Sequence, residues 1–133
     1  MKIIIVGGGQ VGGYIADLLV KEHHSVTVIE NRDKALQALR KNGLSEDCIL
    51  TGDGTDAATL EKAGIMRCNA LVCATGLDET NLTVAMMAKF EYDVPKVVAR
   101  VNNPKNAWLF NAGMGIDVKI NQAGIIGHMI ADE

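Results

Sequence analysis

The sequence lacks features typical of membrane, secreted and nucleic-acid-binding proteins. Its apolar runs are only a few residues long, so no segment predicts a membrane-spanning helix. The N-terminus has a single Lys2 before a strand-like run and a glycine turn, which is not a secretory signal. A net charge of −3 argues against nucleic-acid binding, which needs a cationic face. The three cysteines form no Cys-x-x-Cys pair and are consistent with a reducing cytoplasm.

Groups for catalysis are also scarce. Tyr92 and Lys96 have the Tyr-x-x-x-Lys spacing of short-chain dehydrogenases, but that mechanism needs both side chains one helical turn apart. Pro95 disfavours a helix there, because proline removes a donor and restricts the residue before it. The only serines, Ser25 and Ser45, lie far upstream, and the three histidines do not form a typical metal-ligand set. The sequence therefore predicts neither an enzyme nor a metal site.

The sequence does contain a regular alternation of strand-like and helix-like segments. The strand-like runs cover residues 2–6, 25–30, 48–51, 70–74, 97–101 and 116–120. Six strands joined by helices predict an α/β, Rossmann-like, doubly wound parallel sheet with the order 3-2-1-4-5-6. Residues 1–133 are long enough for one such domain. Ligands bind such sheets between the first and fourth strands, where the loops at 7–13 and 74–81 meet.

Several helix ends are also predicted. Thr55 is the expected N-cap of a helix that stops at Gly64. Asn103 is the expected N-cap of a later helix, with Pro104 at its first position and Gly113 closing it.

Three glycines directly after the first strand form a Gly-x-Gly-x-x-Gly motif. Gly7 permits the tight turn, Gly9 lets the backbone approach a pyrophosphate, and Gly12 lets the helix pack closely on the sheet. The helix N-terminus then offers unpaired N–H groups and a partial positive charge to phosphates. Glu30 follows at the end of the second strand, close to the spacing expected of a ribose-binding carboxylate. The combination predicts a dinucleotide site.

Glu30 also distinguishes between cofactors. A carboxylate accepts hydrogen bonds from both hydroxyls of the adenosine ribose and repels a 2′-phosphate. Arg32 lies two residues further on and can in principle offset this repulsion. We give Glu30 more weight, so NAD(H) or an adenine nucleotide is favoured over NADP(H).

Beyond the glycine motif, the chain resembles a known family over essentially its whole length, namely the N-terminal nucleotide-binding lobe of TrkA-type potassium-uptake regulators, also called RCK or KTN domains. The resemblance is carried by MKIIIVGGGQVGG at the start, GDGTD at 52–56, LEKAGI at 60–65, ATGLDETN at 74–81 and VARVNNP at 98–104. Together these five segments are far more specific than the glycine motif.

The resemblance implies a function and partners. Members of this family bind NAD(H), or in some branches ATP/ADP, AMP or other nucleotides, and control membrane potassium transporters or channels. We therefore expect a non-enzymatic regulator that is cytoplasmic, peripheral to the inner face of the membrane and not inserted in it. Family lobes pair as homodimers and assemble into rings, and Trp108 is the residue expected to be partly exposed and interfacial.

The resemblance also assigns site residues. The glycine loop would hold the pyrophosphate, Glu30 the ribose, and Asp53 would lie beside the adenine. Arg100 would reach the phosphates or the distal ribose, or else form an ion pair with Asp78 or Glu79. The full expected set is Gly7, Gly8, Gly9, Gln10, Val11, Gly12, Glu30, Asn31, Asp53, Gly54, Ala74, Thr75, Gly76, Asn81 and Arg100.

Two departures from the family pattern matter. ATP-sensing relatives tend to have an arginine where this chain has Gln10, and a neutral amide does not offset a triphosphate, which favours NAD(H). Complete members also continue into a C-terminal subdomain, which we expect to be absent here. Two alternatives stay open: a small NAD-dependent oxidoreductase, or the cofactor-binding half of one, and a structural lobe that has lost its ligand.

Overall fold

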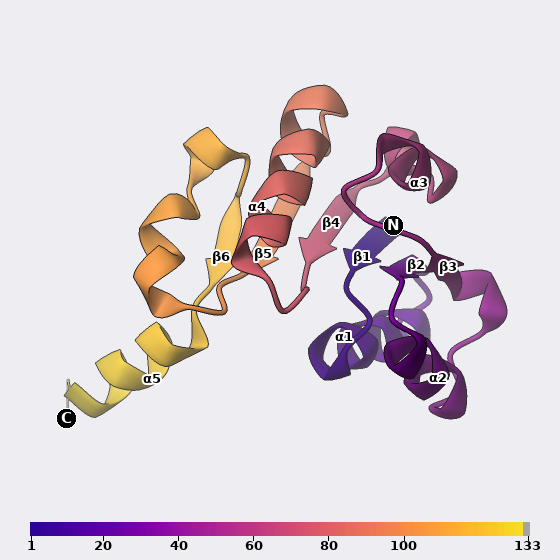
Figure 1. Ribbon diagram of the computed structural model, residues 1–133, viewed down its shortest axis with the longest axis horizontal. Helices are drawn as coiled ribbons and strands as arrows, with labels where there is room; N and C mark the ends of the chain where they lie inside the picture. The colour runs from indigo at the N-terminus through magenta and orange to yellow at the C-terminus, as the bar shows by residue number, and fades with distance from the viewer. Residues whose placement is uncertain (132–133) are drawn as a thin grey trace.

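The six predicted strands form one parallel sheet in the order β3-β2-β1-β4-β5-β6, as predicted (Figure 1). The computed structural model describes residues 1–131. Every strand lies within two residues of its expected bounds, because short β-branched runs bounded by turns are strong local signals. The strands are β1 (Lys2–Val6), β2 (Ser25–Glu30), β3 (Ile49–Thr51), β4 (Ala70–Cys73), β5 (Lys96–Arg100) and β6 (Val118–Ile120).

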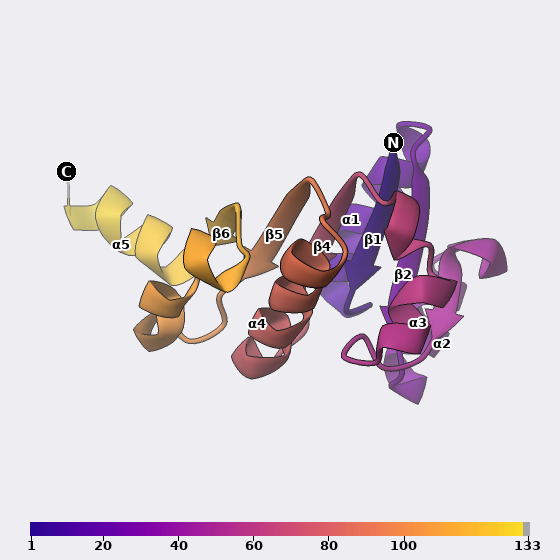
Figure 2. The same ribbon diagram turned by 90° about the horizontal axis from the view of Figure 1, so that it is seen from above.

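Helices cover both faces of the sheet (Figure 2). On one face lie α1 (Gln10–Lys21) and α2 (Asp33–Lys41). Their residues Ala16 and Leu39 pack against the side chains of β1 and β2 on that face, namely Ile3, Ile5, Val26 and Val28. On the other face, α3 (Ala57–Lys62) and α4 (Asp78–Met86) contribute Leu60, Val84 and Ala85 to the larger core. Cys73, at the end of β4, is fully buried in that core.

The connection between β5 and β6 differs from the predicted helix. Asn103 does cap its start, since its side chain accepts a hydrogen bond from the Lys105 N–H at 3.0 Å, and Pro104 follows at the first position. The segment is however a 3₁₀ helix over Pro104–Leu109, followed by a second 3₁₀ turn over Ala112–Met114. Gly113 therefore does not close a helix. Phe110, only 2% exposed, is anchored in the core between the two turns.

The start of α3 also differs by one residue from the prediction. Asp56, rather than Thr55, is the N-cap, and its carboxylate accepts from the Ala58 N–H at 3.1 Å. Thr55 instead donates to Asp53 through both its backbone N–H and its hydroxyl. Gly64 ends the segment as expected, in the left-handed region at φ +92°.

The C-terminal end of the described chain extends away from the rest. Helix α5 (Gln122–Ala131) leaves the edge strand β6 and projects outward (Figure 1). None of the described helices combines the length and apolar character needed to span a bilayer. Trp108 is 73% exposed, as predicted, and its place in an interface stays a prediction.

The remaining short elements are 3₁₀ turns at Glu46–Cys48 and Ile65–Arg67, and a π-helical turn at Met87–Glu91 that continues α4. They connect the strands and helices at positions away from the loops described next.

Candidate nucleotide-binding site

A hollow of about 410 Å³ opens at the carboxyl ends of the central strands. It lies where the sheet order reverses, between β1 and β4, which is the usual ligand position in open α/β sheets. Four loops supply its walls: the turn after β1 and the segments that follow β2, β3 and β4. The lining residues are Val6, Gly7, Ile29, Glu30, Asn31, Arg32, Gly52, Asp53, Gly54, Thr75, Gly76, Leu77 and Thr80.

The glycine loop has the close packing that its motif predicts. Gly7 has φ +110°, and a Cβ there would stand 2.7 Å from the backbone carbon of Ala74. A Cβ on Gly12 would press into the carbonyl oxygen of Gly7, so α1 approaches the loop as closely as backbone allows. The helix starts at Gln10 with Gly9 as N-cap, and no side chain caps it. Its first N–H groups are therefore open to an anion.

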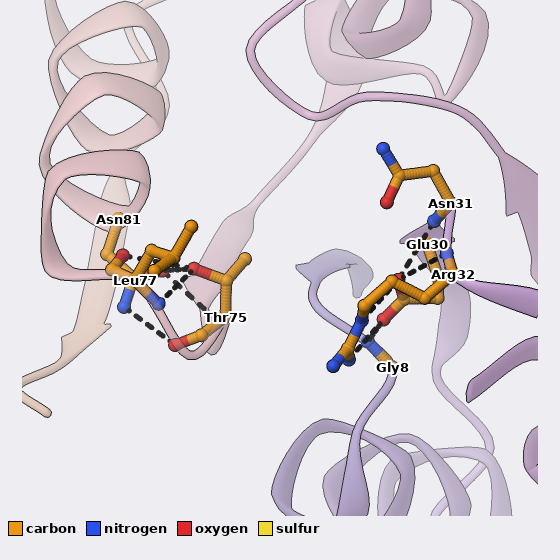
Figure 3. Close-up of polar contacts among 7 residues, drawn as sticks. All are labelled: Gly8, Glu30, Asn31, Arg32, Thr75, Leu77 and Asn81. Atoms are coloured by element: carbon orange, nitrogen blue, oxygen red, sulfur yellow. Dashed lines mark hydrogen bonds and ion pairs between the residues drawn. The ribbon is translucent and has the colours of Figure 1, made fainter. Parts of the chain in front are cut away.

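Glu30 holds this loop from the end of β2 (Figure 3). Its side chain is buried, and its Oε1 accepts from the Gly8 N–H at 2.8 Å. Its Oε2 accepts from the N–H groups of Asn31 and Arg32, both at 2.9 Å. The Arg32 guanidinium covers the remaining side, with Nε 3.1 Å from Oε2 and Nη2 2.9 Å from Oε1.

These contacts decide the charge of Glu30. Burial by itself raises the pKa of the carboxyl, but the hydrogen bonds from Arg32, Gly8 and Asn31 outweigh it and lower the pKa to about 2. The pKa of Arg32 is raised in turn by its hydrogen bond to Glu30. Glu30 is therefore a carboxylate at neutral pH and an acceptor of hydrogen bonds only.

Asp53 lies in the wall formed by the loop after β3. Its Oδ1 accepts from the Thr55 N–H at 2.8 Å and from the Thr55 hydroxyl at 2.7 Å, and these hydrogen bonds lower the pKa of the Asp53 carboxyl. Gly54 follows, and a Cβ there would collide with the Val6 side chain. The loop thus sits tightly over the end of β1 and keeps a charged acceptor at the rim of the hollow.

The loop after β4 is held from behind by Asn81, which is fully buried on α4 (Figure 3). Its Oδ1 accepts from the N–H and the hydroxyl of Thr75, at 3.1 and 2.6 Å. Its Nδ2 donates to the carbonyls of Thr75 and Arg100, at 3.1 and 3.0 Å. All of the hydrogen-bonding positions of Asn81 are thereby filled from within the protein.

The predicted alternative of an ion pair for Arg100 is wrong. Asp78, its suggested partner, instead accepts from the N–H groups of Asn102 and Asn103, at 2.7 and 2.9 Å, and from the Asn106 amide at 2.9 Å. Glu79 lies in no ion pair either, and among residues 1–131 none of the ion pairs includes Arg100. Asp78 is a buried carboxylate and must be hydrogen-bonded, and the backbone N–H groups of residues 102 and 103 supply its donors in place of the Arg100 guanidinium.

The structure divides the expected site residues into three groups. Those lining the hollow are Gly7, Glu30, Asn31, Asp53, Gly54, Thr75 and Gly76. Gly8, Gly9 and Gln10 line a neighbouring hollow between α1 and α2, while Val11, Gly12, Ala74, Asn81 and Arg100 line neither. Their roles toward a ligand stay predictions.

Arg32 lies in the site although the residues expected from the sequence do not include it. It lines both hollows, and its two-residue distance from Glu30 was the available signal in the sequence.

Within the described residues, no group of three or more His, Cys, Asp or Glu side chains is placed to hold a metal ion.

Comparison with known sequences identifies the family of this chain. Residues 3–122 match the model of the TrkA-N domain. The chain is 35% identical over 132 residues to the Trk system potassium uptake protein TrkA of Mycobacterium tuberculosis, covering 99% of this chain and 59% of that protein. It is 41% identical over 119 residues to a TrkA homolog of Methanothermobacter thermautotrophicus, covering 88% of this chain and 52% of that protein. The chain thus spans little more than half the length of these relatives.

Comparison with solved structures supports the fold. The structure of GsuK bound to ADP has a TM-score of 0.79 at 22% identity, covering 98% of this chain and 33% of that one. The GsuK channel bound to NAD has a TM-score of 0.78 at 23% identity, covering 98% and 23%. The AMP-bound Kef C-terminal domain of Shewanella denitrificans has a TM-score of 0.78 at 19% identity, covering 98% and 77%.

Proposed function

Because the chain belongs to the TrkA-N domain family, we propose that it is a regulatory domain that binds NAD(H) and thereby controls a membrane potassium transporter or channel. The observation that carries the proposal is the pairing of an uncapped helix N-terminus at Gly9 with the buried Glu30 carboxylate. The first binds a pyrophosphate, and the second binds the two hydroxyls of a ribose. Glu30 lines the hollow at the sheet's switch point, Gly9 lines the neighbouring hollow between α1 and α2, and Arg32 lines both.

Three neighbours in structure support a nucleotide of this kind, since they hold ADP, NAD and AMP. The choice of NAD(H) for this chain rests on two side chains. Glu30 is ionised and repels a 2′-phosphate, and Gln10 at the first turn of α1 adds no positive charge for a triphosphate. AMP and ADP remain the secondary candidates.

The lining of the hollow supports regulation rather than catalysis. Its ionisable side chains are Glu30, Arg32 and Asp53. A general acid or base works best with a pKa near the operating pH, whereas the pKa values of both carboxyls are lowered and that of the guanidinium is raised. None of the three is therefore suited to transfer a proton at neutral pH.

Thermal unfolding with NADH, NADPH and ATP side by side tests the binding. A ligand at about 100 times its Kd adds about 2.7 kcal/mol to the free energy of unfolding. We expect NADH to raise the Tm by several degrees and NADPH to raise it less. The NADH effect should shrink in Glu30→Gln and persist in Glu46→Gln, which removes an exposed carboxylate paired with Arg40 far along the chain.

If ATP gives the largest shift, the assignment to NAD(H) is wrong; if no nucleotide shifts the Tm, the nucleotide-binding function is wrong. The regulatory part is tested by potassium uptake in cells whose natural copy carries Glu30→Gln or Glu46→Gln. We expect only the first change to alter the response of uptake to the nucleotide.

A further inference from the structure

The outward face of Glu30 is already occupied. The Arg32 guanidinium lies across it with two hydrogen bonds, Nε to Oε2 and Nη2 to Oε1, as Figure 3 shows. Together with the three backbone N–H groups of Gly8, Asn31 and Arg32, five donors converge on this carboxylate. A carboxylate offers about four lone-pair positions. Two ribose hydroxyls therefore have no free acceptor on Glu30 while Arg32 stays in place.

Only the guanidinium among these donors can leave without unfolding anything. The three N–H groups belong to the backbone around β2 and the glycine loop, and they are fixed by the fold. The Arg32 side chain is 62% exposed and is held by Glu30 alone among the ion pairs of the described chain. Glu30 is buried, but the Arg32 end of the pair is open to solvent, which screens the interaction, so displacement of the guanidinium is feasible but has a measurable cost.

The position of the guanidinium coincides with the space that the proposed ligand needs. A Cβ on Gly9 would stand 3.6 Å from Arg32 Nη2, so this group bridges the distance from Glu30 to the glycine loop. It also separates the hollow over the sheet from the hollow between α1 and α2, since it lines both. An adenosine ribose joined to a pyrophosphate on the glycine loop has to enter the same space.

We propose that Arg32 is a specificity-determining residue that occupies the ribose-binding face of Glu30 and must swing away before a nucleotide binds. This inference rests on the proposed function. The fraction of molecules with Arg32 displaced scales the apparent affinity for any nucleotide with free ribose hydroxyls. Arg32 thereby weakens the binding of NAD(H) and AMP.

The same side chain has the opposite effect on a 2′-phosphate. The Arg32 N–H stays bound to Glu30, so the displaced guanidinium remains within reach of the 2′ position. Arginine binds phosphate oxygens in a bidentate fashion, which offsets the repulsion from Glu30. Arg32 therefore narrows the preference for NADH over NADPH that Glu30 creates.

Titration calorimetry with NADH, AMP and NADPH tests the proposal on the wild-type chain, Arg32→Ala and Arg40→Ala. Arg40 is the matched control because it forms a similar two-point contact with Glu46, Nε to both carboxylate oxygens, away from the glycine loop. We expect Arg32→Ala to lower the Kd for NADH and for AMP about three- to fivefold and to raise the Kd for NADPH by a similar factor. Arg40→Ala should leave all three Kd values within about twofold of wild type.

Weaker or unchanged NADH binding in Arg32→Ala would overturn the inference while leaving the proposed function intact, because Arg32 would then be a direct ligand contact or a bystander. An equal change in Arg40→Ala would also overturn it, since the effect would come from net charge. If neither wild type nor Arg32→Ala binds any of the three nucleotides, the proposed function and the inference fail together. If Arg32→Ala binds NADH and AMP more tightly than wild type but binds NADPH no more weakly, Arg32 covers Glu30 as proposed. The contact between Arg32 and a 2′-phosphate would then be rejected.

Discussion

The loops after β1 and after β4 face the same hollow, but a different kind of buried polar side chain holds each of them. Glu30 binds the glycine loop with a charged group whose outer side is covered by the exposed Arg32. Asn81 binds the other loop with a neutral amide, and its four hydrogen bonds go to Thr75 and to the Arg100 carbonyl. Both side chains are buried, and within residues 1–131 no buried side-chain polar atom lacks a partner.

The difference lies in which partners can be exchanged. A buried polar group must be hydrogen-bonded in every state of the protein, so a group whose partners are all fixed has nothing to offer a ligand. Asn81 is such a group, and it determines the shape of one wall. Glu30 has one exposed side-chain partner, Arg32, which the hydroxyls of the proposed ribose would replace without leaving an acceptor unpaired. Variants of Asn81 should therefore act on stability, variants of Arg32 mainly on binding, and variants of Glu30 on both.

Gly12→Ala should have the largest effect and test the glycine-loop side of this comparison. The added Cβ would press into the carbonyl oxygen of Gly7, which is backbone and has little freedom to move. We expect a loss of more than about 3 kcal/mol in the free energy of unfolding, measured by urea denaturation.

Gly13→Ala is the matched control for this change. Gly13 is the next residue of the same helix, and its Cβ would stand 3.1 Å from the end of the Leu39 side chain and 4.0 Å from the Gly8 carbonyl oxygen, which is an ordinary contact. Alanine favours a helix over glycine, so stability should change by less than about 1 kcal/mol. Equal losses in the two variants would mean that helix α1 as a whole, rather than its contact with Gly7, is sensitive.

Asn81→Leu tests the other loop. Leucine has a similar size but leaves the Thr75 N–H and the carbonyls of Thr75 and Arg100 without their partner. We expect a loss of about 3 kcal/mol in the same urea experiment. Thr83→Ala on the exposed side of α4 removes one hydrogen bond to the Glu79 carbonyl and should cost no more than about 0.5 kcal/mol. A loss for Asn81→Leu as small as that of Thr83→Ala would refute the structural role of Asn81.

The acid dependence of stability gives the smallest effect and tests the charge of Glu30. The pKa of Glu30 is about 2 in the folded chain, below its ordinary value of 4.5, so the unfolded chain binds the proton first as pH falls. The stabilisation by Glu30 is complete above about pH 4.5 and is lost as the pH falls toward 2. Screening of the exposed Arg32 reduces the full shift, so we expect about 2 kcal/mol.

This contribution is measured as the difference in unfolding free energy between about pH 5.5 and pH 3, in wild type and in Glu30→Gln. The variant should be less stable than wild type at the higher pH, and the gap should narrow at the lower pH. A gap that stays constant over this range would show that Glu30 acts through packing and not through its charge.

Much of the architecture could be predicted because it depends on local patterns. The bounds of β1 and β2, the glycine turn between β1 and α1, and Glu30 at the end of β2 are all set by short-range sequence with fixed spacing. The connection after β5 shows what local patterns did not predict, namely the type and length of the helix. Asn103 and Pro104 start a helix as predicted, but the burial of Phe110 in the core turns the chain, and 3₁₀ turns replace an α-helix. A cap is a local feature, whereas the length of a helix depends on what it packs against.

The sequence by itself determined the sheet order, the place of the hollow and the acid at its edge, because periodicity and motif spacing fix which strands and turns form. Only the tertiary structure decided how the polar groups of that hollow are paired. Asp78 binds the backbone of residues 102 and 103, Asn81 binds the Arg100 carbonyl, and the Arg32 guanidinium lies over Glu30 beside Gly9. The contacts of Asp78 and Asn81 join residues far apart in the chain. For those two residues the choice of partner depends on which groups the folded sheet brings within hydrogen-bonding distance, which no local pattern encodes. Arg32 and Glu30 are close in sequence, and for them only the position of the guanidinium beside Gly9 depends on the fold.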